Sequence, residues 1–404
     1  MKPLVLSILY ITPWFPSTPD ARDGNFVYHS LSALAKLGVD VSVIVTQPYV
    51  PSVLRKLVGK SMGGVQTGAF SEFSSIDTAR HLSIPRNYAR PISNAIYDAR
   101  CGLAIRQVLK RKRFDLIHAH AESTAPVVAQ VARTAGIPAL VTLHGIDMCQ
   151  RYMEAPLQRS RFRTALNAMD RVVLVGHPLW KFFATLTQRD DHFRVVPNGF
   201  LPPSAELYAT SSARRRLEGR IELISVSNLH EGKGIDINLD ALAQLAGRGF
   251  TGWRYRVVGD GDQRPALEAK VRALGLAHSV EFLGARPHDE VYKLLSEADV
   301  FILPSYREAF GIAYVEAMAL GLLAIGVRGQ GPESFIRNGE TGFLVPPRDA
   351  EALATCLQKV FEQAAQCREM ARLGQSEVWD HWTWESHARH LIGVYEEILQ
   401  RVGK

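Results

Sequence analysis

The sequence predicts an α/β protein made of two similar domains, each with a doubly wound parallel sheet. Short apolar runs alternate with helical patterns along the chain, which is typical of βαβ units. Asn-Gly and Pro-Pro pairs in residues 197–203 interrupt this alternation and indicate a turn and a stiff connection. A length of 404 residues is enough for two domains. We therefore predict a first domain over residues 1–200 and a second over residues 201–383.

The first domain is expected to hold strands separated by helices over residues 25–37 and 92–110. Between them, residues 47–91 show no evident regular element, and an interruption of this length is unusual in an α/β domain. The predicted strands cover residues 3–11, 39–45, 114–118, 139–143, 171–175 and 193–196.

The second domain shows the same alternation and is followed by a helical pattern over residues 384–402. Its predicted strands cover residues 221–227, 253–258, 280–283, 300–303 and 323–327.

Charge is divided unevenly between the halves. Residues 1–200 carry 24 Lys and Arg against 13 Asp and Glu, a net charge of +11, whereas residues 201–404 carry 23 against 27, a net charge of −4. A basic half favours an anionic partner. Its basic runs lack interleaved aromatic residues and any nucleic-acid motif, which argues against DNA or RNA as that partner.

Cysteine usage and apolar run lengths indicate a cytoplasmic protein. The four cysteines form no CxxC pair and no metal-binding spacing, so we expect reduced thiols. The apolar run of residues 3–11 is too short for a signal peptide or a membrane span, and no other run reaches membrane-spanning length. Any membrane contact is therefore expected to be peripheral. The cysteines are Cys101, Cys149, Cys356 and Cys367.

A buried carboxylate is predicted at Glu316, because its helix over residues 311–320 is apolar on nearly every side. Burying an unpaired polar group costs about 2–7 kcal/mol, so Glu316 needs hydrogen-bonding partners. Glu308 lies in the loop before this helix, and the two carboxylates are expected to bracket the helix N-terminus, which favours an anion. A nucleotide-sugar has hydroxyl groups on both sides of its diphosphate. Its hydroxyl groups would satisfy the two carboxylates, and its diphosphate would satisfy the helix N-terminus.

These residues resemble the hallmark of the retaining glycosyltransferases of family GT4, two glutamates separated by seven residues. The likeness continues through Gly321, residues 329–333 and residues 338–345. It implies a GT-B fold, in which two Rossmann-like domains face a central cleft and the C-terminal helix, residues 384–404, packs back on the first domain. It also implies transfer from a UDP- or GDP-linked sugar to a glycan or lipid-linked acceptor, with retention of configuration and no metal or other cofactor.

The resemblance assigns the nucleotide-sugar to loops of the second domain. Lys233 would neutralise the diphosphate, Glu308 would hold sugar hydroxyls and Glu316 would hold the ribose. The helix N-terminus that assists Lys233 consists of Phe310, Gly311 and Ile312.

One position departs from the family pattern. Asn228 stands five residues before Lys233, where relatives usually carry an arginine that also neutralises the diphosphate. Either another cation substitutes or the donor binds more weakly; the candidates are His230, Arg307 and Arg328. Arg286 lies in a loop that contacts the nucleobase in relatives, largely through its backbone. Residues 259–262 look like a Rossmann glycine turn but lack a third glycine.

The first domain contributes His144, which follows a predicted strand in the sequence Leu-His-Gly-Ile-Asp. The resemblance places this histidine near the reacting carbon of the donor sugar, with Asp147 on the acceptor side; a histidine capping the next helix is the alternative. Gly24 is assigned to nucleotide-sugar binding, where it would let the backbone approach a phosphate or sugar, or it would simply cap the helix. The next residue, Asn25, is assigned to the acceptor side together with Asp147.

The predicted catalytic residues are thus His144, Lys233 and Glu308. In the family the leaving phosphate is expected to deprotonate the acceptor on the same face, so no protein nucleophile is assigned. Two alternatives stay open, a nucleotide-sugar epimerase of the same fold and an inactive sugar-nucleotide-binding subunit, which Asn228 favours. The basic residues within 47–91 suggest contact with anionic lipid at the inner face of the cytoplasmic membrane.

Overall fold

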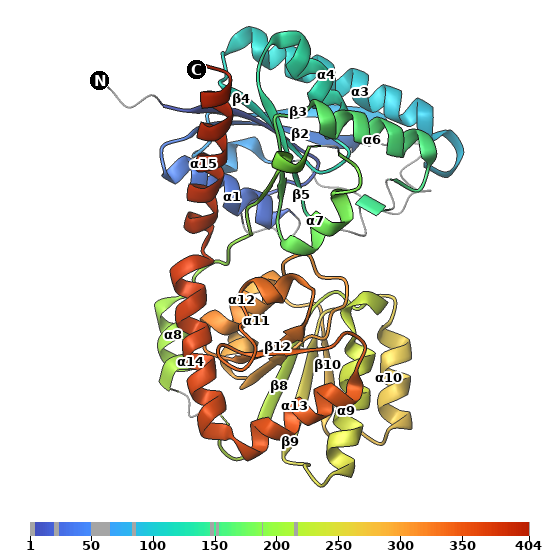
Figure 1. The fold of residues 1–404 in the computed structure, drawn as a ribbon, viewed down its shortest axis with the longest axis vertical. Coiled ribbons are helices and arrows are strands. Elements are labelled where there is room, and N and C mark those ends of the chain that lie inside the picture. The colour runs from blue at the N-terminus through green and yellow to red at the C-terminus, as the bar shows by residue number, and fades with distance from the viewer. Residues whose placement is uncertain are drawn as a thin grey trace. The chain divides into compact units, whose positions relative to one another are not determined.

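The computed structural model describes residues 5–19, 24–49, 65–82, 86–145, 149–150, 153–187, 189–213 and 217–403 (Figure 1). The chain divides into two compact units. The first comprises Met1–Val175, Leu179–Val196 and Trp384–Lys404, and the second comprises Gly176–Pro178 and Pro197–Thr383.

The first unit contains a seven-stranded parallel sheet in the order β3-β2-β1-β4-β5-β6-β7. Its central strands β4, β5 and β6 are buried along their whole length, which explains why they appear in the sequence as continuous apolar runs. The strands are β1 (Ser7–Thr12), β2 (Asp40–Tyr49), β3 (Ser75–Leu82), β4 (Leu116–His120), β5 (Ala139–Leu143), β6 (Arg171–Leu174) and β7 (Phe193–Val195).

Helices connect these strands. They are α1 (Asn25–Lys36), α3 (Arg86–Arg111), α4 (Ala125–Ala135), α6 (Pro156–Ala168), α7 (His177–Phe183) and the C-terminal α15 (Trp384–Arg401).

The prediction that residues 47–91 lack regular structure is wrong for their described part. Strand β2 continues to Tyr49, strand β3 forms the sheet edge, and α3 begins at Arg86. Strand β3 escapes sequence analysis because it is polar and mostly half-exposed; Asp77, for example, pairs with Arg111 at 2.7 Å. Residues 50–64, which include Arg55, lie outside the described residues.

The second unit repeats the architecture with a six-stranded parallel sheet in the order β10-β9-β8-β11-β12-β13. The prediction of two doubly wound parallel-sheet domains is thus confirmed, although the short edge strand β13 was not anticipated. The strands are β8 (Ile221–Val226), β9 (Trp253–Val258), β10 (Val280–Gly284), β11 (Val300–Ile302), β12 (Leu323–Val327) and β13 (Phe343–Val345).

The second unit is also rich in helices, of which α12 carries Glu316. They are α8 (Ala205–Ala213), α9 (Ile235–Gly247), α10 (Arg264–Ala273), α11 (His288–Ser296), α12 (Ile312–Ala319), α13 (Ala350–Glu362) and α14 (Ala364–His381). No helix within the described ranges combines the length and apolar character that a membrane span requires.

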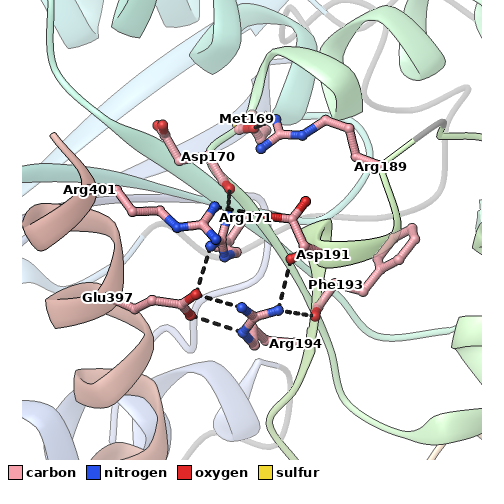
Figure 2. A network of polar contacts seen from close by, with 9 residues as sticks. All are labelled: Met169, Asp170, Arg171, Arg189, Asp191, Phe193, Arg194, Glu397 and Arg401. Atoms are coloured by element: carbon pink, nitrogen blue, oxygen red, sulfur yellow. Dashed lines mark hydrogen bonds and ion pairs between the residues drawn. The ribbon is translucent and has the colours of Figure 1, made fainter.

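Helix α15 packs beside α1 in the first unit and is fixed by an ion-pair network at its C-terminal half (Figures 1 and 2). Glu397 of α15 accepts hydrogen bonds from Arg171 at 2.6 Å and from Arg194 at 2.9 Å. Arg171 is only 1% exposed, so its buried positive charge needs the negative charge of Glu397 beside it. The bonds from Arg171 and then Arg194 lower the pKa of Glu397 to about 2.

Glu397→Gln should therefore destabilise the first unit by about 3 kcal/mol at neutral pH, because it leaves Arg171 buried without its counter-charge. The pKa of Glu397 is lower in the folded state, so its contribution is present above pH 4.5 and is lost as the pH falls toward about 2. Urea unfolding between pH 7 and pH 2 measures both effects.

Glu385→Gln is the matched control on the same helix, since Glu385 is 62% exposed in its pair with Arg389. Equal losses of stability in the two variants would show that the Glu397 network contributes no more than a surface ion pair.

Candidate functional site

Two groups of polar side chains lie where strands end, one in each unit. In the second unit they occupy the loops that follow β8, β11 and β12. In the first unit they follow β4 and β5. The carboxyl ends of parallel strands are where open α/β sheets bind ligands.

Lys233 and Glu308, predicted from separate loops, form an ion pair in the structure. Lys233 ends a short 3-10 turn after β8, and its Nζ lies 2.8 Å from Glu308 Oε2. Both side chains are largely buried, with 18% and 14% of their surface exposed. A mostly buried ion pair that keeps some exposure leaves donor and acceptor atoms available to a ligand.

The loop from Glu308 to the start of α12 is held by backbone contacts. Gln330 Oε1 accepts from the Glu308 N–H at 3.0 Å, and the Gly331 N–H donates to the Glu308 carbonyl at 2.9 Å. Gly311 adopts a left-handed conformation, with φ of 98°, and a Cβ there would lie 2.7 Å from the Tyr314 ring. This position therefore requires glycine.

The N-terminus of α12 presents free donors. No side chain caps the helix, and no described residue accepts from the backbone N–H groups of Ile312 or Ala313. The Glu308 Cγ lies 3.3 Å from the position that a Gly311 Cβ would take, so the Lys233–Glu308 pair adjoins this terminus. A cation and unpaired N–H groups in one place suit a phosphate group.

Glu316 is buried as predicted, with 8% of its surface exposed, and its partner is His288 at the start of α11. His288 Nε2 lies 2.8 Å from Glu316 Oε1. Burial alone would lower the pKa of His288, but the hydrogen bond to Glu316 and the charges of Glu316 and Asp289 raise it above 6.5. The ring of His288 also packs edge-on against Tyr292, with centroids 4.6 Å apart.

The remaining predicted residues of the second unit lie in the loops after β8, β10, β11 and β12. Asn228 is exposed and its carbonyl accepts from the His230 N–H at 3.1 Å. Arg286 lies 3.6 Å from Glu290 at the surface. Arg328 is exposed after β12. Arg307 instead packs on the turn that carries Lys233, since its Cβ lies 3.3 Å from where a Gly232 Cβ would be.

In the first unit, His144 follows β5 and contacts His120, the last residue of β4, through the two Nε2 atoms. Phe26 and Trp14 line the pair, with ring centroids 4.8 and 6.1 Å from that of His144. Burial, with a smaller contribution from His387, lowers the pKa of His144 to about 3. His144 is therefore neutral at physiological pH.

The other first-unit predictions have mixed outcomes. Gly24 precedes α1 with φ of 82°, and a Cβ there would lie 2.8 Å from the Phe15 nitrogen, so the close approach that requires glycine is to the chain itself. The buried Oδ1 of Asn25 has no partner among the described residues. Asp147 lies outside the described residues.

Sequence reasoning missed His288, His120 and Gln330. His288 carried no signal, because its role depends on how α11 packs against α12. His120 could have been found, since His118 and His120 alternate at the end of an apolar strand. Across the described ranges, no three His, Cys, Asp or Glu side chains gather in a way that could hold a metal ion.

Comparison of the sequence with known proteins identifies its family. A family model described as Glycosyltransferase Family 4 matches residues 24–200, and one described as Glycosyl transferases group 1 matches residues 210–376. The colanic acid biosynthesis glycosyltransferase WcaL of Escherichia coli is 31% identical over 297 residues, covering 69% of this chain and 68% of that protein. The chain belongs to the GT4 family of glycosyltransferases.

Other relatives match over different lengths. A Salmonella typhimurium protein, also named WcaL, is 36% identical over 143 residues, only 34% of this chain and 35% of that protein. Glycogen synthase of Mycobacterium tuberculosis is 24% identical over 404 residues, 96% of this chain and 94% of that protein.

Solved structures establish the GT-B fold of this GT4 protein. Sucrose-phosphate synthase from Thermosynechococcus elongatus superposes with a TM-score of 0.74 at 21% identity, covering 98% of this chain and all of that one. Anabaena HepE in complex with UDP superposes with a TM-score of 0.72 at 20% identity, covering 97% of this chain and 100% of that one.

The Glu316–His288 contact predicts an elevated histidine pKa. Glu316→Gln should lower the pKa of His288, because it removes the charge that, with the hydrogen bond, outweighs the opposing effect of burial. The pair stabilises the fold fully below pH 6.5, and this contribution is lost as the pH rises through the raised pKa. Histidine ring NMR titration measures the shift. Asp289→Asn, which removes the weakest of these effects, is the control; a larger shift in that variant would contradict the assignment.

Proposed function

We propose that this GT4 protein is a retaining glycosyltransferase that moves a sugar from a UDP- or GDP-linked donor to a glycan or lipid-linked acceptor. The observation that carries the proposal is the Lys233–Glu308 pair beside the free N-terminus of α12. A diphosphate needs cationic and N–H donors, and a sugar needs a carboxylate that accepts from its hydroxyl groups. HepE, of the same fold, is solved with UDP, which supports a nucleotide donor.

In the proposed reaction, the bond between the anomeric carbon and the diphosphate oxygen breaks, and its electron pair leaves with the diphosphate. Lys233 and the N–H groups of Ile312 and Ala313 stabilise the charge that develops on this leaving group. The acceptor oxygen bonds to the anomeric carbon from the same face, and its proton passes to the departing phosphate. Glu308 holds the sugar hydroxyls, and no protein nucleophile is needed.

Glu316 is assigned to the ribose of the donor. Its carboxylate is buried but already oriented by His288 at 2.8 Å, so one oxygen is fixed and the other remains to accept from a hydroxyl pair. A preoriented carboxylate binds such a pair without losing further side-chain freedom.

His230 and Arg307 both pack on the turn that carries Lys233, because a Cβ at Gly232 would lie 3.5 Å from the His230 ring and 3.3 Å from the Arg307 Cβ. Arg307 is proposed as the substitute for the arginine absent at Asn228, since its guanidinium is always charged. Its Cβ adjoins Gly232, and the Tyr306 N–H donates to the Gly232 carbonyl at 3.1 Å, so Arg307 and Lys233 share one packed pair of loops. The long arginine side chain can reach a phosphate from there, whereas Asn228 offers no charge.

The acceptor is proposed to be a growing polysaccharide or its lipid-linked precursor. The support comes from relatives named for colanic acid biosynthesis and for amylovoran biosynthesis, the latter from Erwinia amylovora. A net charge of +11 over residues 1–200 suits an anionic lipid carrier at the cytoplasmic membrane face.

Glu316→Gln should weaken UDP binding by about 10- to 100-fold, because one hydrogen bond to a charged group contributes about 1.5–3 kcal/mol. Isothermal titration calorimetry measures the affinity. Glu340→Gln is the control, since Glu340 is a carboxylate 68% exposed at the surface. Unchanged UDP affinity in a folded Glu316→Gln variant would reject the ribose assignment.

Nucleoside diphosphate release from a panel of UDP- and GDP-sugars, with and without lipid-linked acceptor, tests the function itself. We expect nucleoside diphosphate release to require the acceptor. Lys233→Met should lower the release rate roughly 100-fold or more, because it removes the cation that stabilises the leaving diphosphate. Acceptor-independent release of free sugar would indicate the epimerase, and UDP binding without any turnover would indicate the inactive subunit.

A further inference from the structure

The contact between His144 and His120 is unusual, because both residues use the same ring nitrogen. Strands β4 and β5 are parallel neighbours in which His120 is in register with Thr142, so His144 follows two residues later. The rings lie 4.2 Å apart, centroid to centroid, and a hydrogen bond joins Nε2 of one to Nε2 of the other. Two nitrogens can share a hydrogen bond only if one carries a proton and the other a lone pair.

The surroundings of His120 indicate which ring is the donor. Its Nδ1 is buried and has no partner among the described residues. If Nε2 of His120 accepted, the neutral ring would carry its proton on Nδ1 and bury an unpaired N–H, which native structures rarely tolerate. If Nε2 donates instead, Nδ1 carries only a lone pair among aromatic rings. This arrangement costs less than a buried N–H without an acceptor.

We propose that His120 is a positioning residue that donates its Nε2–H to Nε2 of His144 and thereby fixes His144 as the neutral Nδ1–H tautomer. The described residues provide no partner for Nδ1 of His144. In this tautomer Nδ1 of His144 carries the ring proton, which it can donate to a ligand oxygen.

The backbone around His120 is constrained strongly enough to hold this orientation. The next residue, Ala121, has φ of 80°, which is uncommon for a residue with a Cβ. It is held there by its N–H, which donates to the Thr142 carbonyl at 3.0 Å, and by Thr124, whose hydroxyl donates to the His120 carbonyl at 2.8 Å. A retained unfavourable conformation next to a polar pair indicates that the surrounding structure determines it.

Aromatic rings fix the position of the two imidazoles from the sides. Tyr10, Trp14 and Phe26 have ring centroids 5.5, 5.7 and 5.9 Å from that of His120. Burial, followed by smaller effects of His144, His118 and His387, lowers the pKa of His120 well below its ordinary value. Both members of the pair are thus uncharged at physiological pH, as the assignment requires.

The role of His144 rests on the proposed glycosyl transfer and makes it more specific. A neutral Nδ1–H can donate to a sugar hydroxyl. Its Nε2 lone pair is occupied by His120, so His144 does not act as a general base through that atom. An uncharged donor also avoids placing positive charge beside a sugar carbon that becomes electron-poor in the transition state.

NMR of the whole protein with ¹⁵N-labelled histidine tests the tautomer directly. We expect His144 to show a protonated Nδ1 and a lone pair on Nε2 at pH 7. His120→Leu, which keeps a similar volume but cannot donate, should release His144 to a mixture of tautomers. His120→Gln, whose amide can reach the same nitrogen, should restore the Nδ1–H form. His390→Gln, an exposed position on α15, is the control.

Kinetics provide the second readout. His120→Leu should lower kcat by about tenfold with donor affinity nearly unchanged, and His120→Gln should recover most of it. A protonated Nε2 or an imidazolium on His144 in the unaltered protein would overturn the proposal even if the variants failed to fold. A folded His120→Leu variant with an unchanged His144 tautomer and an unchanged kcat would also overturn the proposal. The NMR result does not depend on turnover, so loss of the proposed function would be distinguished from loss of the tautomer assignment.

Discussion

Burial of two carboxylates around helix α12 is the constraint on which the second unit depends. Glu308 and Glu316 are both largely removed from water, and each must be paired because an isolated buried charge would be strongly unfavourable. Lys233 comes from the turn after β8 and pairs with the loop before α12, whereas His288 comes from α11 and pairs with α12 itself. The same contacts that keep the helix in place also orient the groups assigned to the donor.

Close backbone contact between loops makes this pairing possible. A Cβ at Gly234 would lie 2.4 Å from the Pro304 carbonyl, and one at Gly331 would lie 2.4 Å from Phe310. The loops after β8, β11 and β12 therefore touch through their main chains, with no side chain between them. This brings Lys233 within hydrogen-bonding distance of Glu308, although 75 residues separate them.

Sequence patterns predicted the parts of the molecule that depend on local chemistry. Apolar runs predicted the buried strands and the helix that begins after Gly311. The apolar surface of that helix predicted that Glu316 is buried. Strand β3 and His288 could not be predicted in this way, because β3 is polar at a sheet edge and His288 depends on packing between helices. His120 lies between these cases, since its spacing was visible but its partner was set by the register of β4 with β5.

The candidate site residues of the two units differ in ionisation, and this bears on the absence of an arginine at Asn228. The second unit places cations next to buried acids, and the raised pKa of His288 is one consequence. The first unit collects histidines in an aromatic environment that lowers the pKa of His144 to about 3. In the proposed function, charge for a diphosphate therefore comes from Lys233, Arg307 and the α12 terminus rather than from the histidines of the first unit. Under the same proposal, the N–H groups of Ile312 and Ala313 supply part of the electrostatic stabilisation that an arginine at position 228 would otherwise provide.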